Sequence, residues 1–238
     1  MDQALVDRGF FDSRARAQAA IKAGRVKLDG VTLSKASALV APDAVLEASP
    51  EHPYVSRGAL KLVASLDDYA LRPDGLVCLD VGASTGGFSE VLLARGAAHV
   101  FAVDVGHDQL HPRLSGHPRL TLLEGRDART LLPHDLTMPP QIITIDVSFI
   151  SLTKILGPVL ALAAPAAVVV ALVKPQFEVG RALVGKGVVR DAQARLRACD
   201  DVGKFIADLG WQVQGVKASP LQGGTGNIEY LLVVRRAP

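Results

Sequence analysis

The sequence predicts an α/β protein in which a doubly wound parallel sheet follows a small basic domain. Short apolar runs recur along residues 76–173, each with the length and composition of a buried strand. The first run, Leu76–Leu79, leads directly into a glycine-rich turn at residues 80–88, as in proteins that bind a nucleotide at the carboxyl end of a strand. Basic residues cluster near the start of the chain instead, before a proline-marked linker.

The glycine-rich turn reads Asp-Val-Gly-Ala-Ser-Thr-Gly-Gly-Phe. A dinucleotide fold requires G-x-G-x-x-G, whose middle glycine lets the backbone approach a pyrophosphate. This turn lacks that glycine and therefore suits an uncharged or cationic group, such as the methionine part of S-adenosylmethionine. A plain strand–helix turn with glycines for chain geometry is the alternative. The residues expected to bind the cofactor here are Gly82, Ala83, Ser84, Thr85, Gly86, Gly87 and Phe88.

Two acidic residues extend the predicted cofactor site. Asp104 ends the apolar run at residues 99–104, 22 positions after Gly82. An acid about 20 residues beyond the turn can accept hydrogen bonds from the ribose hydroxyls; capping of a following helix is the alternative. Asp127 follows the third run, residues 119–124, where such folds place a side chain against the adenine amino group. A solvated loop aspartate is the alternative for Asp127.

Composition is that of an ordinary globular protein: 238 residues, 49% hydrophobic and 21% charged. The formal net charge is only +2, so affinity for nucleic acid requires a local patch. Cys78 and Cys199 have neither metal-ligand nor disulfide spacing. His107 and His111 stand four apart without a strong third ligand, so no metal site is expected. The first residues lack the features of a signal peptide, which predicts a reducing, cytoplasmic location.

One apolar segment has the length of a membrane span. Residues 155–173 carry no charge over 19 positions. However, Pro158 and Pro165 interrupt the segment, and its composition changes from Ala/Leu-rich at residues 152–164 to β-branched at residues 166–173. We therefore expect a helix followed by a central strand that is buried on both faces.

The chain divides near residue 50, and the first part is basic. Residues 8–35 carry seven basic residues against two acidic ones. Residues 12–24 predict a capped helix that ends at a glycine, and residues 25–31 predict a strand that leads into an Asp-Gly turn. Such a surface suits RNA phosphates, with a solvated charged face as the alternative. The predicted RNA-binding residues are Arg8, Arg14, Arg16, Lys22, Arg25, Lys27 and Lys35.

Four charged residues stand where functional groups gather in such a fold. Asp146 ends the fourth apolar run and Lys174 the fifth, so both are expected at the carboxyl edge of the sheet, beside the glycine turn, where Asp146 is also expected to bind the cofactor. Lys61 lies at the entry to the larger domain, and Glu229 opens the last strand, residues 230–234. Each residue alone is more typical of a surface group or an ion pair. Together they predict one cleft.

Six ordered motifs give the chain a family resemblance. They are residues 55–62, 82–88, 146–151, 174–178, 187–191 and 226–229. Together they resemble the TlyA family, haemolysin-named 2′-O-methyltransferases of ribosomal RNA that join an S4-type RNA-binding domain to an FtsJ-like methyltransferase domain. The resemblance implies a Rossmann-like class I methyltransferase sheet of seven strands, with domains at residues 1–48 and 56–238 and a linker at 49–55. It assigns the family's catalytic Lys-Asp-Lys-Glu tetrad to Lys61, Asp146, Lys174 and Glu229.

The resemblance implies S-adenosylmethionine-dependent 2′-O-methylation of cytidine in ribosomal RNA. Residues 52–55 lack the basic, tryptophan-containing character of members that act on both ribosomal subunits, and the chain begins and ends close to its first helix and last strand. We therefore expect large-subunit RNA as the substrate. The expected partner is ribosomal RNA in a ribosomal subunit, with neither membrane nor DNA. A membrane-lytic haemolysin and an RNA-binding assembly chaperone without turnover are the rival functions.

The chemistry of this reaction explains the need for a tetrad. A ribose 2′-hydroxyl is a poor nucleophile and a methyl sulfonium is already activated, so the protein must orient the two and remove a proton. A lysine can serve as the base only when its neutral amine is populated, which burial or a neighbouring cation favours. We expect Lys174 to be the base and Lys61 to tune it. Asp146 and Glu229 would hold the amines in place but favour their charged form.

Overall fold

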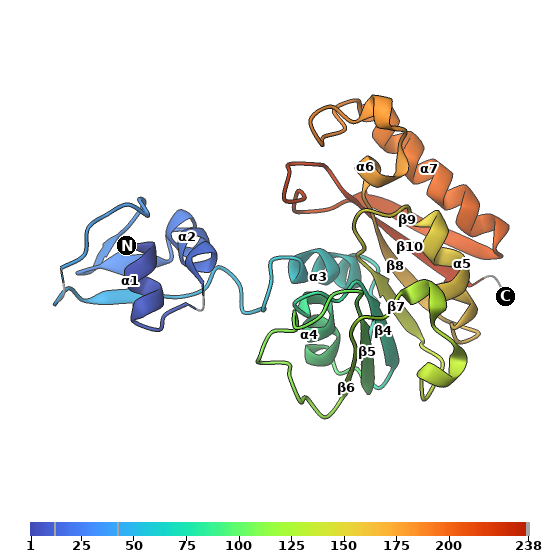
Figure 1. The fold of residues 1–238 in the computed structure, drawn as a ribbon, viewed down its shortest axis with the longest axis horizontal. Helices are drawn as coiled ribbons and strands as arrows, with labels where there is room; N and C mark the ends of the chain where they lie inside the picture. Colours follow the sequence, from blue (N-terminus) through green and yellow to red (C-terminus); the bar gives the residue numbers. More distant parts are fainter. Residues whose placement is uncertain (12, 42, 237–238) are drawn as a thin grey trace. The chain divides into compact units, whose positions relative to one another are not determined.

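The computed structural model describes residues 1–11, 13–41 and 43–236 (Figure 1). The chain forms two compact units, Met1–Pro53 and Tyr54–Pro238. The division falls within the segment 49–55; the limits of the linker and of the two domains stay predictions. Asp12, the first residue of the predicted helix 12–24, and the last two residues of the predicted domain 56–238 lie outside the described residues.

The smaller unit packs two helices against a three-stranded antiparallel sheet of order β2-β1-β3. Its elements are α1 (Asp2–Asp7), α2 (Arg14–Lys22), β1 (Val26–Leu28), β2 (Val31–Thr32) and β3 (Leu46–Ala48). The predicted Asp-Gly turn joins β1 to β2: Asp29 and Gly30 have φ of 49° and 79°, the left-handed values that a two-residue hairpin turn requires. The predicted strand 25–31 is divided by this turn, and α1, β2 and β3 are additional to the elements expected from the sequence.

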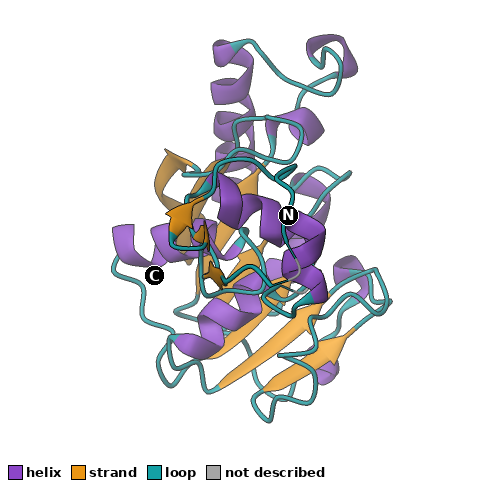
Figure 2. Ribbon diagram, turned by 90° about the vertical axis from the view of Figure 1, so that its left-hand side faces the viewer, coloured by secondary structure: helices purple, strands orange, loops and turns teal. Residues whose placement is uncertain are grey.

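The larger unit is a seven-stranded sheet of order β6-β5-β4-β7-β8-β10-β9 (Figures 1 and 2). The first five strands in this order are parallel, and β10 and β9 are antiparallel to their neighbours. The strands are β4 (Val77–Val81), β5 (His99–Val103), β6 (Leu120–Leu123), β7 (Ile142–Ile145), β8 (Val168–Val173), β9 (Trp211–Ala218) and β10 (Tyr230–Arg236). The predicted fold class is therefore confirmed.

Helices cover both faces of this sheet and so bury its central strands, which are apolar on both sides. Residues of α3 (Ala59–Asp68) and α4 (Gly87–Ala94) pack on one face. Residues of α5 (Thr153–Ala161) and α7 (Ala192–Asp208) pack on the other, and the short α6 (Pro175–Glu178) follows β8. The chain winds outward from β4 through β5 and β6, then returns to β7 and β8 on the other side. The carboxyl ends of β4 and β7 thus meet at the point where α/β sheets bind ligands.

The long apolar segment forms a helix and a strand, as the composition predicted. Residues 155–173 contain most of α5, with Pro158 inside it, and the whole of β8. All six residues of β8 are buried. The structure therefore overturns the alternative of a single membrane-spanning helix for this segment. Among the described residues, every helix is too short or too polar to cross a bilayer.

Candidate active site

The glycine-rich turn is shaped by close approach to the end of β7. Gly82 has a φ of 83°, and a Cβ there would collide with the carbonyl oxygen of Asp146. Gly86 has a φ of 89° as the N-cap of α4, where a Cβ would collide with the side chain of Leu114. Both glycines are therefore required by chain geometry, whether or not a ligand binds. The open turn still leaves Gly82 and Ser84 facing a cavity.

This first cavity, which we call the cofactor cavity, measures about 470 Å³ and lies over the ends of β4, β5 and β7. Asp104 lines it and orders its wall, since its two carboxylate oxygens accept hydrogen bonds from the backbone amides of Ser84 and Gly106, each at 2.7 Å. The residues directly after Asp104 form bends and turns, so the helix-capping alternative does not apply. Its carboxylate keeps lone pairs for ribose hydroxyls.

Asp127 and Asp146 also line the cofactor cavity. Asp127 is paired with Arg129, whose guanidinium holds the pKa of that carboxyl below its ordinary value. The turn residues that do not line this cavity are Ala83, Thr85, Gly86, Gly87 and Phe88; Phe88 is 4% exposed and packs in the core. Carboxylate acceptors beside apolar residues such as Val103 and Ile155 fit the hydroxyls and the ring of a nucleoside. Arg126 and Arg129 line the same cavity, so the charges of its lining are close to balanced.

Asp80, the first residue of the glycine-rich segment, lies within β4 and is fully buried. Its carboxylate accepts hydrogen bonds from the hydroxyls of Ser89, at 2.7 Å, and Thr144, at 2.9 Å. Burial raises the pKa of Asp80 to about 6, although both hydroxyls oppose the shift. Asp80 is thus a buried, hydrogen-bonded acid of the core and does not line the cofactor cavity.

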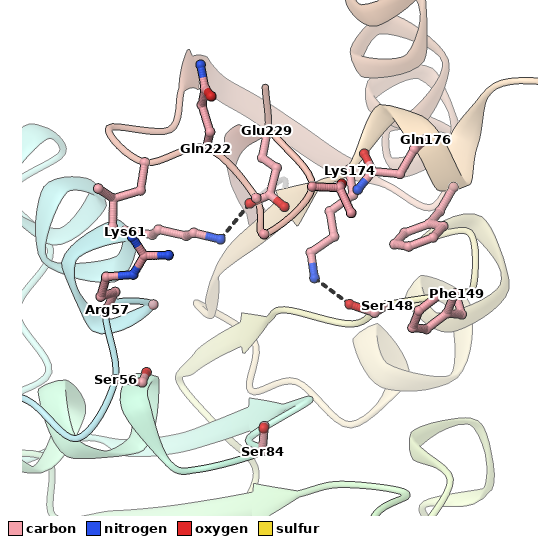
Figure 3. A pocket seen from close by; sticks show the side chains of 16 residues that line it. Ser56, Arg57, Lys61, Ser84, Ser148, Phe149, Lys174, Gln176, Gln222 and Glu229 are labelled. Carbon is pink, nitrogen blue, oxygen red and sulfur yellow. Dashed lines mark hydrogen bonds and ion pairs between the residues drawn. The ribbon is translucent and has the colours of Figure 1, made fainter. Parts of the chain in front are cut away.

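The four tetrad residues converge at the carboxyl edge of the sheet and form two ion pairs. Lys61 on α3 places its Nζ 2.5 Å from an oxygen of Glu229 (Figure 3). Lys174, at the end of β8, places its Nζ 2.6 Å from Asp146 and donates a 2.8 Å hydrogen bond to Ser148. Both lysines are 9% exposed and Glu229 is 3% exposed. Each lysine therefore has its own carboxylate, an arrangement that the sequence did not distinguish from a single cluster.

A second cavity, the substrate cleft, measures about 690 Å³ and is lined by Lys61, Lys174 and Glu229. It shares three wall residues with the cofactor cavity, namely Ser84, Ser148 and Phe149. The Lys174–Asp146 pair bridges the two, because Lys174 lines the cleft and Asp146 lines the cofactor cavity. Groups bound in the two cavities would meet at this shared wall.

Phe149 is an exposed aromatic residue on the shared wall. Its side chain is 91% exposed, and its φ of 64° is rare for a bulky residue. The ring packs on Phe177, with 5.2 Å between centroids. Phe149 and Ser148 lie in the motif 146–151, but the sequence pattern alone assigns neither residue a role. The exposure of the ring is visible only in the structure.

Asn227 fixes the loop that carries Glu229. It is 1% exposed, accepts a hydrogen bond from the Val189 amide, and donates to the Gly187 carbonyl and the Thr225 hydroxyl. These bonds tie two of the predicted motifs together, residues 187–191 and 226–229. Thr225 and its neighbours Leu221–Gly224 line the substrate cleft and were not anticipated from the sequence.

The predicted RNA-binding cations differ in their availability. Three of them have partners within the smaller unit, namely Arg8 with the Ala41 and Ala44 carbonyls, Arg14 with Asp2, and Lys27 with Glu47. Arg16 is half-buried. Lys22, Arg25 and Lys35 are exposed, and within the described part of the chain their side chains are in no ion pair. The last three are the cations best placed to meet phosphates. In the same described part, no group of three metal-ligating side chains gathers.

Sequence comparison identifies relatives for both units. The family described as FtsJ-like methyltransferase matches residues 54–236, and the S4 domain matches residues 2–46. The chain is 46% identical, over 99% of its length and 89% of the relative, to the 16S/23S rRNA (cytidine-2′-O)-methyltransferase TlyA of Mycobacterium tuberculosis. It is 41% identical to the 23S rRNA (cytidine-2′-O)-methyltransferase TlyA of Campylobacter jejuni, over 74% of this chain and 69% of that relative.

A solved structure supports the same assignment. A hemolysin-named protein from Streptococcus thermophilus is 38% identical and superposes with a TM-score of 0.79, covering 99% of this chain and 87% of that chain. The resemblance that the six motifs carried is therefore confirmed across both units.

Proposed function

This chain belongs to the FtsJ-like methyltransferase and TlyA families, and on that premise we propose that it transfers the methyl group of S-adenosylmethionine to the 2′-hydroxyl of a cytidine in ribosomal RNA. The observation that carries the proposal is the shared wall between the cofactor cavity and the substrate cleft. Donor and acceptor held on its two sides meet beside Lys174, which is the geometry that a direct transfer requires.

In this reaction, S-adenosylmethionine when bound supplies a methyl group activated by a positively charged sulfur. Asp104 would hold the ribose of the cofactor and Asp127 its adenine, since both residues line the cofactor cavity. Lys174 would take the 2′-hydroxyl proton, so that the oxygen could attack the methyl group that the bound cofactor would supply. Asp146, 2.6 Å away, stabilises the ammonium that results. Lys61, held by Glu229, orients the ribose in the substrate cleft.

The substrate cleft suits a nucleotide taken out of an RNA structure. Phe149 offers an exposed ring on which a base can stack, and base–aromatic stacking is a common mode of RNA recognition. Residues 1–48 form the RNA-binding domain in this proposal, joined by the linker 49–55 to the methyltransferase domain at 56–238. The exposed cations Lys22, Arg25 and Lys35 supply phosphate contacts, which position RNA without reading its sequence.

We further propose that large-subunit RNA is the substrate and that the protein acts where ribosomes are assembled, in the cytoplasm. Residues 52–55, His-Pro-Tyr-Val, carry neither an arginine or lysine nor a tryptophan, and one relative is named for 23S rRNA alone. A relative named for both subunits favours the alternative of dual specificity.

The proposal is tested by incubating the protein with isolated large or small ribosomal subunits and methyl-labelled S-adenosylmethionine. The subunits should come from a strain that lacks this gene, so that the target is unmodified. Label should enter large-subunit RNA at a cytidine 2′-oxygen, and the Lys174→Ala variant should leave it unlabelled. Label in both subunits would refute the large-subunit restriction, and label in neither would refute the function itself.

A further inference from the structure

The segments that follow β7 and β8 are fastened to each other along their length. We call residues 146–152 the β7 loop; it faces residues 174–178, which are Lys174 and α6. The contacts pair in order along both segments. Lys174 contacts Asp146 and Ser148, and Phe177 packs on Phe149. The last contact is made by Glu178, to which this reaction's chemistry gives no role.

Glu178 binds the far end of the β7 loop through both oxygens of its carboxylate. Oε2 accepts a 2.6 Å hydrogen bond from the Ser151 hydroxyl, and Oε1 accepts a 2.9 Å hydrogen bond from the backbone amide of Leu152. Leu152 is the N-cap of α5 and is 2% exposed. The carboxylate therefore anchors the loop at the point where it enters the core. Burial of this group raises the pKa of Glu178 above its ordinary value, although both hydrogen bonds oppose the shift.

The β7 loop needs such an anchor because its middle is strained. Phe149 has a left-handed φ of 64°, which is unfavourable for a bulky residue. Its ring is almost entirely exposed, so packing of the ring contributes little to hold this conformation. The loop is held on one side by the bond from Lys174 to Ser148 and on the other by Glu178. Without the second anchor, the loop can relax and carry Ser148 away from Lys174.

We propose that Glu178 is a positioning residue for methyl transfer: its carboxylate fastens the β7 loop to α6 and so keeps the side chain of Lys174 in contact with that of Asp146. The inference rests on the proposed function only for its kinetic consequence. Displacement of catalytic groups by about 1 Å costs on the order of 100-fold in rate. Glu178→Ala should therefore lower kcat by roughly 10- to 100-fold.

Glu178→Gln distinguishes geometry from charge. Its amide oxygen can still accept from the Leu152 amide, and its NH₂ group can donate to Ser151, whose hydroxyl then turns toward Thr153, 2.8 Å away. This variant should keep kcat within a few-fold of wild type. Ser151→Ala removes one of the two bonds, and its loss of kcat should lie between those of the two Glu178 variants.

Asp191→Ala is the matched control. Asp191 also accepts backbone amides at a helix N-terminus, those of Gln193 and Ala194 at the start of α7, and it lines neither cavity. It should lose stability without losing kcat. Single-turnover methyl transfer and the thermal midpoint are measured for each variant, with hydrogen exchange of the Leu152 amide as a readout that needs no activity.

The proposal expects faster exchange at Leu152 and lower kcat in Glu178→Ala, and near-normal values in Glu178→Gln. It is overturned if Glu178→Ala keeps the wild-type kcat, if Glu178→Gln is as impaired as Glu178→Ala, or if Asp191→Ala loses as much kcat. Should Glu178→Ala not fold, Ser151→Ala decides the same question. A wild-type protein without methyl transfer would refute the proposed function, while exchange at Leu152 would still confirm or overturn the anchor.

Discussion

Replacing Asp80 with asparagine should remove a pH dependence of stability that this buried acid imposes. Burial raises its pKa from 3.8 to about 6 in the folded protein. Between these values the folded state holds a proton that the unfolded chain has released, so raising the pH opposes folding. The stability from this group is complete below about pH 4 and is lost as the pH rises through about 6. About two pKa units at roughly 1.4 kcal/mol each correspond to about 3 kcal/mol.

Asp80→Asn is neutral at every pH and should escape this loss. Its amide can keep the bond from Thr144, and the hydroxyl of Ser89, which lies within α4, can turn to a backbone carbonyl one turn earlier. We allow about 1 kcal/mol for the rearranged hydrogen bond. The variant should then be more stable than wild type by about 2 kcal/mol at pH 7.5, and less stable by about 1 kcal/mol at pH 4.

The assay is urea unfolding from pH 4 to pH 8, followed by the fluorescence of Trp211, the one tryptophan of the chain. Trp211 is 4% exposed in β9 and reports on the larger unit. The difference between variant and wild type isolates Asp80 from the other acids. Asp67→Asn is the control of opposite sign, because Arg95 lowers the pKa of Asp67 and its contribution is lost as the pH falls. A difference between Asp80→Asn and wild type that stays constant across this range would refute the reasoning.

Substitutions in the cofactor cavity, in the smaller unit and at Phe149 test three further parts of the account. Asp104→Ala should weaken binding of S-adenosylmethionine roughly 10- to 100-fold, because the ribose hydroxyls and the Ser84 and Gly106 amides all lose their hydrogen-bond acceptor. An unchanged affinity in calorimetric titration would show that Asp104 is not part of the site. Charge reversal at the three exposed cations of the smaller unit, Lys22, Arg25 and Lys35, should weaken RNA binding and flatten its salt dependence while cofactor affinity stays constant. If filter binding at several salt concentrations matches wild type, these cations do not bind RNA. Phe149→Gly should leave the thermal midpoint unchanged or raise it, since glycine accepts the left-handed φ, yet should lower activity by removing the ring; full activity would exclude stacking on Phe149.

Much of the larger unit could be predicted because its strands are buried on both faces. Such strands appear in the sequence as continuous apolar runs, and Val168–Val173 is the clearest example. The strand β9 was not located, since it lies at the sheet edge and only Trp211 in it is fully buried. In the smaller unit, the hairpin turn at Asp29-Gly30 was predicted by its residue types, whereas the three-residue β3 carries no comparable signal.

The candidate site was predicted as a set of residues but not as an arrangement. Strand ends identified Asp146 and Lys174, because parallel strands present their carboxyl ends at one edge. Which lysine pairs with which acid depends on side-chain directions, so the sequence left the Lys61–Glu229 pair open. Likewise, the anchor made by Glu178 joins residues 26 and 27 positions away, and no local pattern reveals such a contact.

The central claim is that Lys174 takes the proton of the 2′-hydroxyl. Single-turnover methyl transfer by Lys174→Arg, with saturating ribosomal RNA and S-adenosylmethionine, tests it most directly. Arginine keeps a positive charge beside Asp146 but cannot give up its proton at working pH. The account predicts a rate lowered by about 10²- to 10⁴-fold, as for loss of a general base. A Lys174→Arg protein with a near-wild-type rate would contradict the claim and leave Lys174 with an electrostatic role.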